Sequence, residues 1–148
     1  MNYKIVSRTM GRLLWAEAAF LCLPLLVSLY YKENLYHIYL LTIGLLAGVG
    51  AVLNLPKSEK RTIYAREGFV IVALSWILMS LFGALPFVFS GEIPSMIDAM
   101  FEVVSGFTTT GATILVNIEA MSKSLLFWRA FTHWLGGMGI IVFVLAFL

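Results

Sequence analysis

Hydrophobic residues dominate four long segments of the chain, and the stretches between these segments carry most of the charged residues. The four segments cover residues 13–31, 35–55, 69–89 and 125–148. A helix of ~20 residues crosses the ~30 Å hydrocarbon core of a membrane, so this pattern predicts four transmembrane helices. The composition agrees, because 61% of the 148 residues are hydrophobic and only 12% are charged. A soluble domain of this size leaves roughly a third of its unfolded surface exposed to water. The small number of polar residues in this chain does not suffice to cover such a surface.

The positions of lysine and arginine predict how these helices are oriented. Seven of the ten lie before the first hydrophobic segment or between the second and the third. They are Lys4, Arg8, Arg12, Lys57, Lys60, Arg61 and Arg66. Because such residues stay on the cytoplasmic side, we expect a multi-pass protein with a cytoplasmic N-terminus. The opposite side then carries more acidic than basic residues, which suits the gathering of cations from outside but fits ordinary solvated loops equally well.

The same composition argues against other classes of function. The formal net charge is only +2, and the chain has no basic run and no zinc-type cysteine pattern, so we expect no nucleic-acid partner. The sequence contains no nucleophile–base pair, metal-ligand cluster or phosphate-binding loop. We therefore expect neither an enzyme nor a bound cofactor, and we expect membrane lipid as the main surroundings.

The stretch of residues 90–124 is more hydrophobic than an ordinary external loop. Its pattern predicts a helix over residues 95–105, with Ser95 as N-cap and Asp98 three positions later in a variant of the capping box. Gly106 follows as the expected C-terminal stop. A helix of about 11 residues is ~16 Å long, which is too short to cross a bilayer but long enough to reach its middle.

The next residues, 105–115, read SGFTTTGATIL and are poorly suited to a helix. An extended chain of this length spans up to ~35 Å, so the helix and this stretch together predict a re-entrant pore loop. The backbone of residues 108–113 then presents carbonyl oxygens to a dehydrated cation, as in potassium filters. Glycine at position 111 supplies backbone torsions that a side chain forbids. The alternative is a surface helix followed by a threonine-rich turn that binds no ion.

Polar residues around this loop allow two interpretations. Asp98 and Glu102 share one face of the short helix and either attract cations or serve the structure, Asp98 by capping the helix and Glu102 by bonding a neighbouring loop. Arg129 and His133 share a face near the start of the last segment. A basic side chain beside the entrance of a cation pathway would repel the cation. We therefore expect the basic residues here to pair with Glu102 or Glu119.

Three features of the hydrophobic segments are expected to be structural. Glu17 lies in the first segment, a little over one turn from Arg12, and we expect its side chain to extend toward the cytoplasmic interface; a buried functional carboxylate is the alternative. Pro86 is expected to mark the outer end of the third segment. Glycines of the second and fourth segments are expected to allow close helix packing, and a bend is the alternative for those of the fourth; they are Gly44, Gly48, Gly50, Gly136, Gly137 and Gly139.

Four stretches of the sequence resemble a known family. They are REGFVIVALSW (66–76), GALPF (83–87), IDAMFEVVSGFTTTGAT (97–113) and FWRAFTHWLGGMGIIV (127–142). In order and spacing they are similar to the potassium-uptake proteins of the Trk/Ktr/HKT superfamily, and most closely to its bacterial TrkH family. The helix pair before residue 66 fits TrkH proteins as well.

The resemblance implies an all-α membrane protein with four transmembrane helices, one re-entrant pore helix and a filter loop. Residues 1–65 would form an N-terminal helix pair, and residues 66–148 the first unit of outer helix, pore helix, filter loop and inner helix. The filter would centre on Thr109, Thr110 and Gly111, with potassium bound at Thr109 and Thr110. Thr108 and Ala112 would flank it.

The resemblance also implies potassium transport across the bacterial inner membrane as part of a Trk uptake system. A TrkA-like nucleotide-binding regulator would bind on the cytosolic side, and no residue of this chain is assigned to that contact. Family members carry four such units around a central pore, whereas this sequence holds one filter loop and ends at Leu148 within a hydrophobic run. We therefore expect an N-terminal portion of a longer protein. The alternatives are a homo-oligomer, in particular a homo-tetrameric cation channel, and a non-conducting remnant.

Overall fold

The computed structural model describes residues 3–56 and 65–147, with side chains for 3–56 and 67–139. Four residues named above, Lys57, Lys60, Arg61 and Leu148, and the side chain of Arg66 lie outside the described residues. The described residues form helices and no strand. The elements are α1 (Tyr3–Tyr30), α2 (Tyr36–Asn54), α3 (Ala65–Gly83), α4 (Leu85–Ser90), α5 (Met96–Phe107), the 3-10 helix η1 (Ile118–Ala120) and α6 (Lys123–Phe147).

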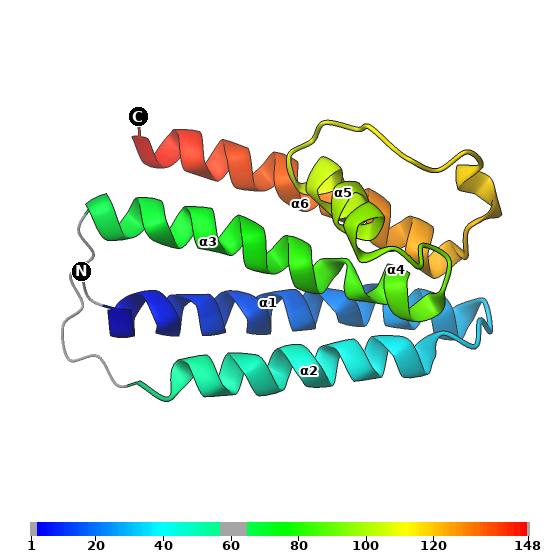
Figure 1. Cartoon of the computed structure of the whole chain (residues 1–148), viewed down its shortest axis with the longest axis horizontal. Helices are drawn as coiled ribbons and strands as arrows, with labels where there is room; N and C mark the ends of the chain where they lie inside the picture. Colours follow the sequence, from blue (N-terminus) through cyan, green and yellow to red (C-terminus); the bar gives the residue numbers. More distant parts are fainter. Residues whose placement is uncertain (1–2, 57–64, 148) are drawn as a thin grey trace.

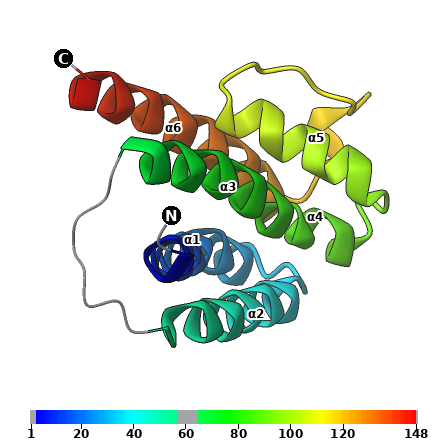
Figure 2. The same ribbon diagram turned by 60° about the vertical axis from the view of Figure 1, so that its left-hand side comes forward.

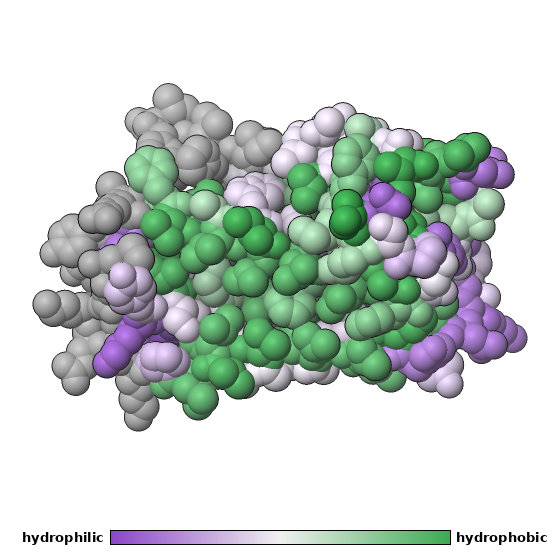
Figure 3. All heavy atoms as spheres, in the orientation of Figure 1, coloured by the Kyte–Doolittle hydropathy of each residue, from purple (hydrophilic) through white to green (hydrophobic). Residues whose placement is uncertain are grey.

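Three stretches of helix are long and apolar enough to cross a membrane. They are Tyr3–Tyr30, Tyr36–Asn54 and Glu67–Ser90, and they correspond to the first three predicted spans. The helix α6 has 25 residues, but the side chains of its last part lie outside the described residues, so the fourth span stays a prediction. In Figure 3 hydrophobic residues cover the middle of the visible face, and hydrophilic residues gather at its two ends.

The helices form two groups that pack side by side (Figures 1 and 2). Helices α1 and α2 run antiparallel and contact each other along their length. On the other side of α1, α3 and α6 contact it, and α5 packs against both α3 and α6. The buried core between the groups includes Leu14, Leu21, Tyr39, Leu46, Phe87, Phe107, Leu125 and Trp128.

Glycine brings α1 and α2 close together at one point. A Cβ added to Gly11 would lie 2.7 Å from the Gly50 carbonyl oxygen, and one added to Gly50 would lie 2.5 Å from the Trp15 ring. The packing role predicted for Gly50 is confirmed. Among the described residues nothing lies within 4 Å of a Cβ added to Gly44 or Gly48, so their packing role stays a prediction.

The third span is divided at residue 84, between α3 and α4. Proline has no amide hydrogen and prevents a regular helix, and Pro86 lies in the first turn of α4. The Phe87 amide donates to the Ala84 carbonyl at 3.1 Å, while the carbonyl of Gly83 accepts a hydrogen bond of 2.9 Å from the buried Trp128 indole. Because the span continues to Ser90, the prediction that Pro86 marks its end is wrong.

The prediction for Glu17 is also wrong. Its side chain is buried (0% exposed) and does not extend to the interface. Instead it faces α3 and α5, where a Cβ added to Gly83 would lie 3.1 Å from Glu17 Oε1 and 3.1 Å from Val103 Cγ1. Arg12 is exposed and lies between one and two turns away on a different face of α1. Packing by helices distant in sequence therefore covers a carboxyl group that proximity to Arg12 had placed near water.

Candidate functional site

The short helix α5 begins at the residue expected from the sequence. The Ser95 side chain accepts a hydrogen bond of 3.4 Å from the Asp98 amide, which satisfies one of the free amide groups of the first turn. The N-cap prediction is confirmed. One face of the helix is buried and consists of Ala99, Glu102, Val103, Ser105, Gly106 and Phe107.

The end of α5 differs from the prediction. The helix continues through Gly106 to Phe107, so Gly106 is not the stop. Two backbone amides that follow the helix donate hydrogen bonds to carbonyls of its last turn. Thr109 N–H donates to the Gly106 carbonyl and Thr110 N–H to the Ser105 carbonyl, each at 2.9 Å. This is the hydrogen-bond pattern of a Schellman motif, in which the residue with positive φ is usually glycine. Here that residue is Thr109, with φ of 56°.

Gly106 is required for packing rather than for the turn. A Cβ on Gly106 would lie 2.2 Å from Thr132 Oγ1 of α6. A Cβ on Gly136 would lie 2.1 Å from the carbonyl oxygen of Phe107 and 2.6 Å from its carbonyl carbon. The helix α6 thus packs directly on the last turn of α5 at two glycines, which confirms the packing role predicted for Gly136.

The threonine-rich segment after α5 is tied to the helix by hydroxyl groups. Ser105 Oγ donates to the Ala112 carbonyl at 2.6 Å. Thr108 Oγ1 donates to the Val104 carbonyl at 2.7 Å and lies 2.8 Å from Thr110 Oγ1. In Figure 2 α5 runs from the α4 end toward the middle of the molecule, and the following segment returns to the end where α6 begins.

The five predicted filter residues lie together in this segment, and all are exposed: Thr108, Thr109, Thr110, Gly111 and Ala112. Gly111 has φ of 78°, a torsion that favours glycine as predicted. The positive φ of Thr109 was not predicted from the sequence, because a β-branched residue rarely adopts such a torsion. Strain of this kind gathers at functional sites. Within the described side chains, no cluster of three or more His, Cys, Asp or Glu offers a metal site. Residues 108–112 themselves offer a cation only carbonyl and hydroxyl oxygens.

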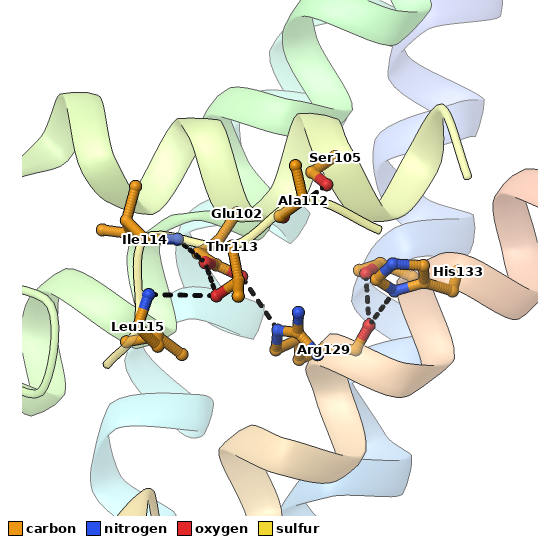
Figure 4. Close-up of polar contacts among 9 residues, drawn as sticks. Glu102, Ser105, Ala112, Thr113, Ile114, Leu115, Arg129 and His133 are labelled. Carbon is orange, nitrogen blue, oxygen red and sulfur yellow. Dashed lines mark hydrogen bonds and ion pairs between the residues drawn. The ribbon is translucent and has the colours of Figure 1, made fainter. Parts of the chain in front are cut away.

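Glu102 anchors the returning segment to α5 and α6 (Figure 4). Its Oε1 accepts a short hydrogen bond from the Thr113 hydroxyl and one of 2.8 Å from the Ile114 amide. Its Oε2 accepts a hydrogen bond of 2.8 Å from Arg129 Nε in an ion pair, with the glutamate side chain 0% and the arginine side chain 15% exposed. The predicted pairing of Arg129 with Glu102 and the predicted bond from Glu102 to a neighbouring loop are both confirmed.

These contacts hold Glu102 in its ionised form. Burial raises the pKa of Glu102, but the hydrogen bonds from Thr113, Arg129 and Ile114, together with the arginine charge, outweigh burial and lower the pKa overall. His133 takes no part in this network, because its Nδ1 lies 3.0 Å from the Arg129 carbonyl of its own helix. The negative charge at this position is neutralised by Arg129, which favours a supporting role for Glu102.

Two further glutamates cap the start of α6, and the sequence did not reveal them. Glu33, in the α1–α2 turn, accepts from the Lys123 amide at 2.6 Å and from the Ser124 hydroxyl at 2.6 Å. Glu92, after α4, accepts from the Ser122 amide at 3.1 Å and from its hydroxyl. Two of the acidic residues that we considered for gathering cations are therefore engaged in capping a helix. The sequence signal was the pair of serines, Ser122 and Ser124, just before the last hydrophobic segment.

The fold and the site together define a helical membrane protein in which a short helix supports an exposed, threonine-rich backbone segment. The sequence model of the TrkH family, described as a cation transport protein, matches residues 38–148. The chain belongs to the TrkH family of cation transport proteins, the class expected from the sequence.

Several relatives match the whole chain. It is 36% identical over 150 residues to the Trk system potassium uptake protein TrkH of Halomonas elongata, and 39% identical over 151 residues to the protein of that name from Escherichia coli; both alignments cover 100% of this chain and 31% of the relative. The crystal structure of the potassium transporter TrkH from Vibrio parahaemolyticus is 37% identical with a TM-score of 0.92, and the match covers 100% of this chain and 32% of that one. The chain thus spans about a third of the length of these relatives.

Proposed function

We propose that this chain forms part of a potassium pathway across the bacterial inner membrane, within a Trk-type uptake system. In this proposal α1, α2, α3 with α4, and α6 cross the membrane with the N-terminus in the cytoplasm, and α5 with the following segment is a re-entrant pore helix and filter loop. Family membership and the potassium-uptake names of its relatives support the proposal. Residues 1–65 then act as a helix pair and residues 66–148 as one pore unit, and a TrkA-like regulator is the expected cytosolic partner.

Potassium is proposed to bind the backbone carbonyl oxygens of Thr109 and Thr110, flanked by Thr108, Gly111 and Ala112. The orientation of the amide groups supports this assignment. The N–H groups of Thr109, Thr110 and Gly111 all donate back to carbonyls of α5, which removes the backbone donors that repel a cation. The C-terminal end of a helix also carries a partial negative charge, and α5 ends at this segment.

The observation that carries the proposal is how firmly an exposed segment is held. Its backbone lies open, yet Ser105, Glu102 and the close contact of Gly136 with Phe107 fix both of its ends to α5 and α6. A cation filter presents carbonyl oxygens in place of the hydration shell of the ion, and these contacts hold the carbonyls of an exposed segment in position.

The test is rubidium uptake by cells that lack their own potassium importers. The cells express either this chain alone or a chimera in which the chain replaces the segment that it matches in the Escherichia coli relative. We expect Gly111→Val to abolish uptake, because a β-branched residue rarely adopts a φ of 78°. Gly91→Val is the matched control, since Gly91 has φ of 76°, also in open space, at the end of α4.

Each outcome has a defined meaning. Loss of uptake in Gly111→Val but not in Gly91→Val supports the filter, because both variants carry the same backbone strain. Unchanged uptake in Gly111→Val contradicts the filter assignment. Uptake by the chain alone supports assembly of several copies around one pore, and uptake by the chimera only supports a unit that works within a longer protein.

A further inference from the structure

Glu17 is a buried carboxyl group with no hydrogen-bond partner. Both of its oxygens are inaccessible and unpaired within the part of the chain that the structure describes, and the side chain is 0% exposed. Buried polar atoms nearly always have a partner, and an exception requires an explanation. The network around Glu102 does not supply one, because its donors are Thr113, Ile114 and Arg129.

The carboxyl group lies where three helices meet. Its Oε1 is 3.1 Å from the position of a Cβ on Gly83, the last residue of α3. The same position is 3.1 Å from Val103 Cγ1 and 3.6 Å from the Phe107 ring, both of α5. Glycine at position 83 therefore leaves space beside the carboxyl group, and the α5 atoms closest to that Cβ position are hydrocarbon.

The charged side chains of the neighbouring helices are engaged or lie elsewhere. On α6, Arg129 is paired with Glu102 of α5, and His133 contacts its own helix. On α3, Glu67 lies in the first turn, more than four turns before Gly83.

The remaining titratable groups lie near helix starts or at the surface. On α2, His37 and Tyr39 are among the first four residues, whereas α1 contacts the second half of α2 near position 15, at Ala47 and Gly50. Asp98 lies in the first turn of α5, and Lys123 begins α6. On α1 itself, Arg12 is exposed.

The complete burial of Glu17 favours a proton as its ligand over anything larger. Another protein segment does not reach a side chain that this chain covers completely. A metal cation needs several oxygen ligands around it, whereas the α5 atoms beside the Gly83 Cβ position, which Glu17 Oε1 also approaches, are carbons of Val103 and Phe107. An ionised carboxylate without donors is very costly in such surroundings.

We propose that Glu17 is a proton-binding site, in which the neutral acid packs at the junction of α1, α3 and α5. Release of the proton would place an unpaired charge against Val103 and Phe107 and separate α1 from the end of α5. Since Phe107 immediately precedes the threonine-rich segment, proton binding at Glu17 would set the position of that segment. This last consequence rests on the proposed function, whereas the proton site itself does not.

The proton is tested by infrared spectroscopy of the chain in lipid bilayers. We expect the C=O stretching band of a protonated carboxylic acid at neutral pH and its loss in Glu17→Gln. The matched control Glu33→Gln keeps the band, because Glu33 caps α6 at the surface with backbone donors. If Glu17→Gln does not insert, Glu17→Asp is used, which keeps the acid and shifts the band. A wild-type spectrum without the band, or a band unchanged in these Glu17 variants, overturns the proposal.

The consequence for transport is tested separately in the chimera described above. We expect rubidium uptake to fall as the acid band disappears with rising pH, and to stay constant over that range in Glu17→Gln, which does not ionise. An equal fall in both contradicts the coupling to the threonine-rich segment. A chimera in which uptake is insensitive to Gly111→Val contradicts the proposed function instead, and the infrared result still decides on the proton site.

Discussion

The ion pair between Glu102 and Arg129 is the residue-level contact that joins α5, α6 and the returning segment. We expect Arg129→Met to lower the free energy of unfolding by about 3 kcal/mol, because it leaves a buried carboxylate without its counter-charge. The measurement is unfolding of the purified chain in mixed micelles by a denaturing detergent. The control Arg12→Met removes an exposed arginine and is expected to have little effect, so equal losses in both variants contradict the assigned role.

Residues that act locally were predicted from the sequence, and residues defined by distant contacts were not. Ser95 as a cap and Gly111 as a glycine with positive φ follow from neighbouring residues alone. For Arg129 the sequence left two acidic partners open, Glu102 and Glu119, and the structure shows the pair with Glu102. The burial of Glu17 and the need for glycine at 106 depend on helices far away in sequence. No local pattern contains that information.

At the scale of elements, the start of α6 depends on a residue from the α1–α2 turn. Glu33→Ala removes the acceptor for the Lys123 and Ser124 amides, and loss of such a cap costs about 1 kcal/mol. We expect faster hydrogen exchange of these amides in the variant. Glu119→Ala, which changes an exposed glutamate of η1, is the control, and equal exchange rates in wild type and Glu33→Ala contradict the capping role.

The elements themselves were largely predictable, and their boundaries less so. Long hydrophobic runs identified α1, α2 and the third span, because their length alone distinguishes them from loops. The division between α3 and α4 was not predicted: Pro86 was taken as the end of the span, whereas it lies in the first turn of α4, and the Trp128 indole that bonds the Gly83 carbonyl comes from a helix distant in sequence. The helix α5 ends beyond Gly106 because packing on α6 uses that glycine.

At the scale of the whole molecule, the predicted orientation is open to a direct test. In a Cys22→Ser background, we expect Glu119→Cys to react with a membrane-impermeant maleimide in intact cells. Lys4→Cys is expected to react only after the cells are opened, because positively charged ends stay in the cytoplasm. The reverse pattern would show that the chain is inserted the other way round.

The class of the whole molecule followed from composition, and its family from four short motifs. What the chain does as a whole was less accessible, because it spans about a third of the length of its relatives. The threonine-rich segment is exposed, so it forms only one side of any site to which it contributes.

The link between Pro86 and Trp128 also has an evolutionary consequence. Proline disturbs the regular helix between α3 and α4, and the indole of Trp128 bonds the Gly83 carbonyl at that point. In a lineage that replaced Pro86, a regular helix could form here and a backbone amide could bond the Gly83 carbonyl. Selection for tryptophan at position 128 would then weaken. A lineage that replaced Trp128 first would leave a buried carbonyl unpaired, which is costly. The two positions should therefore vary together among relatives, with the change at 86 coming first.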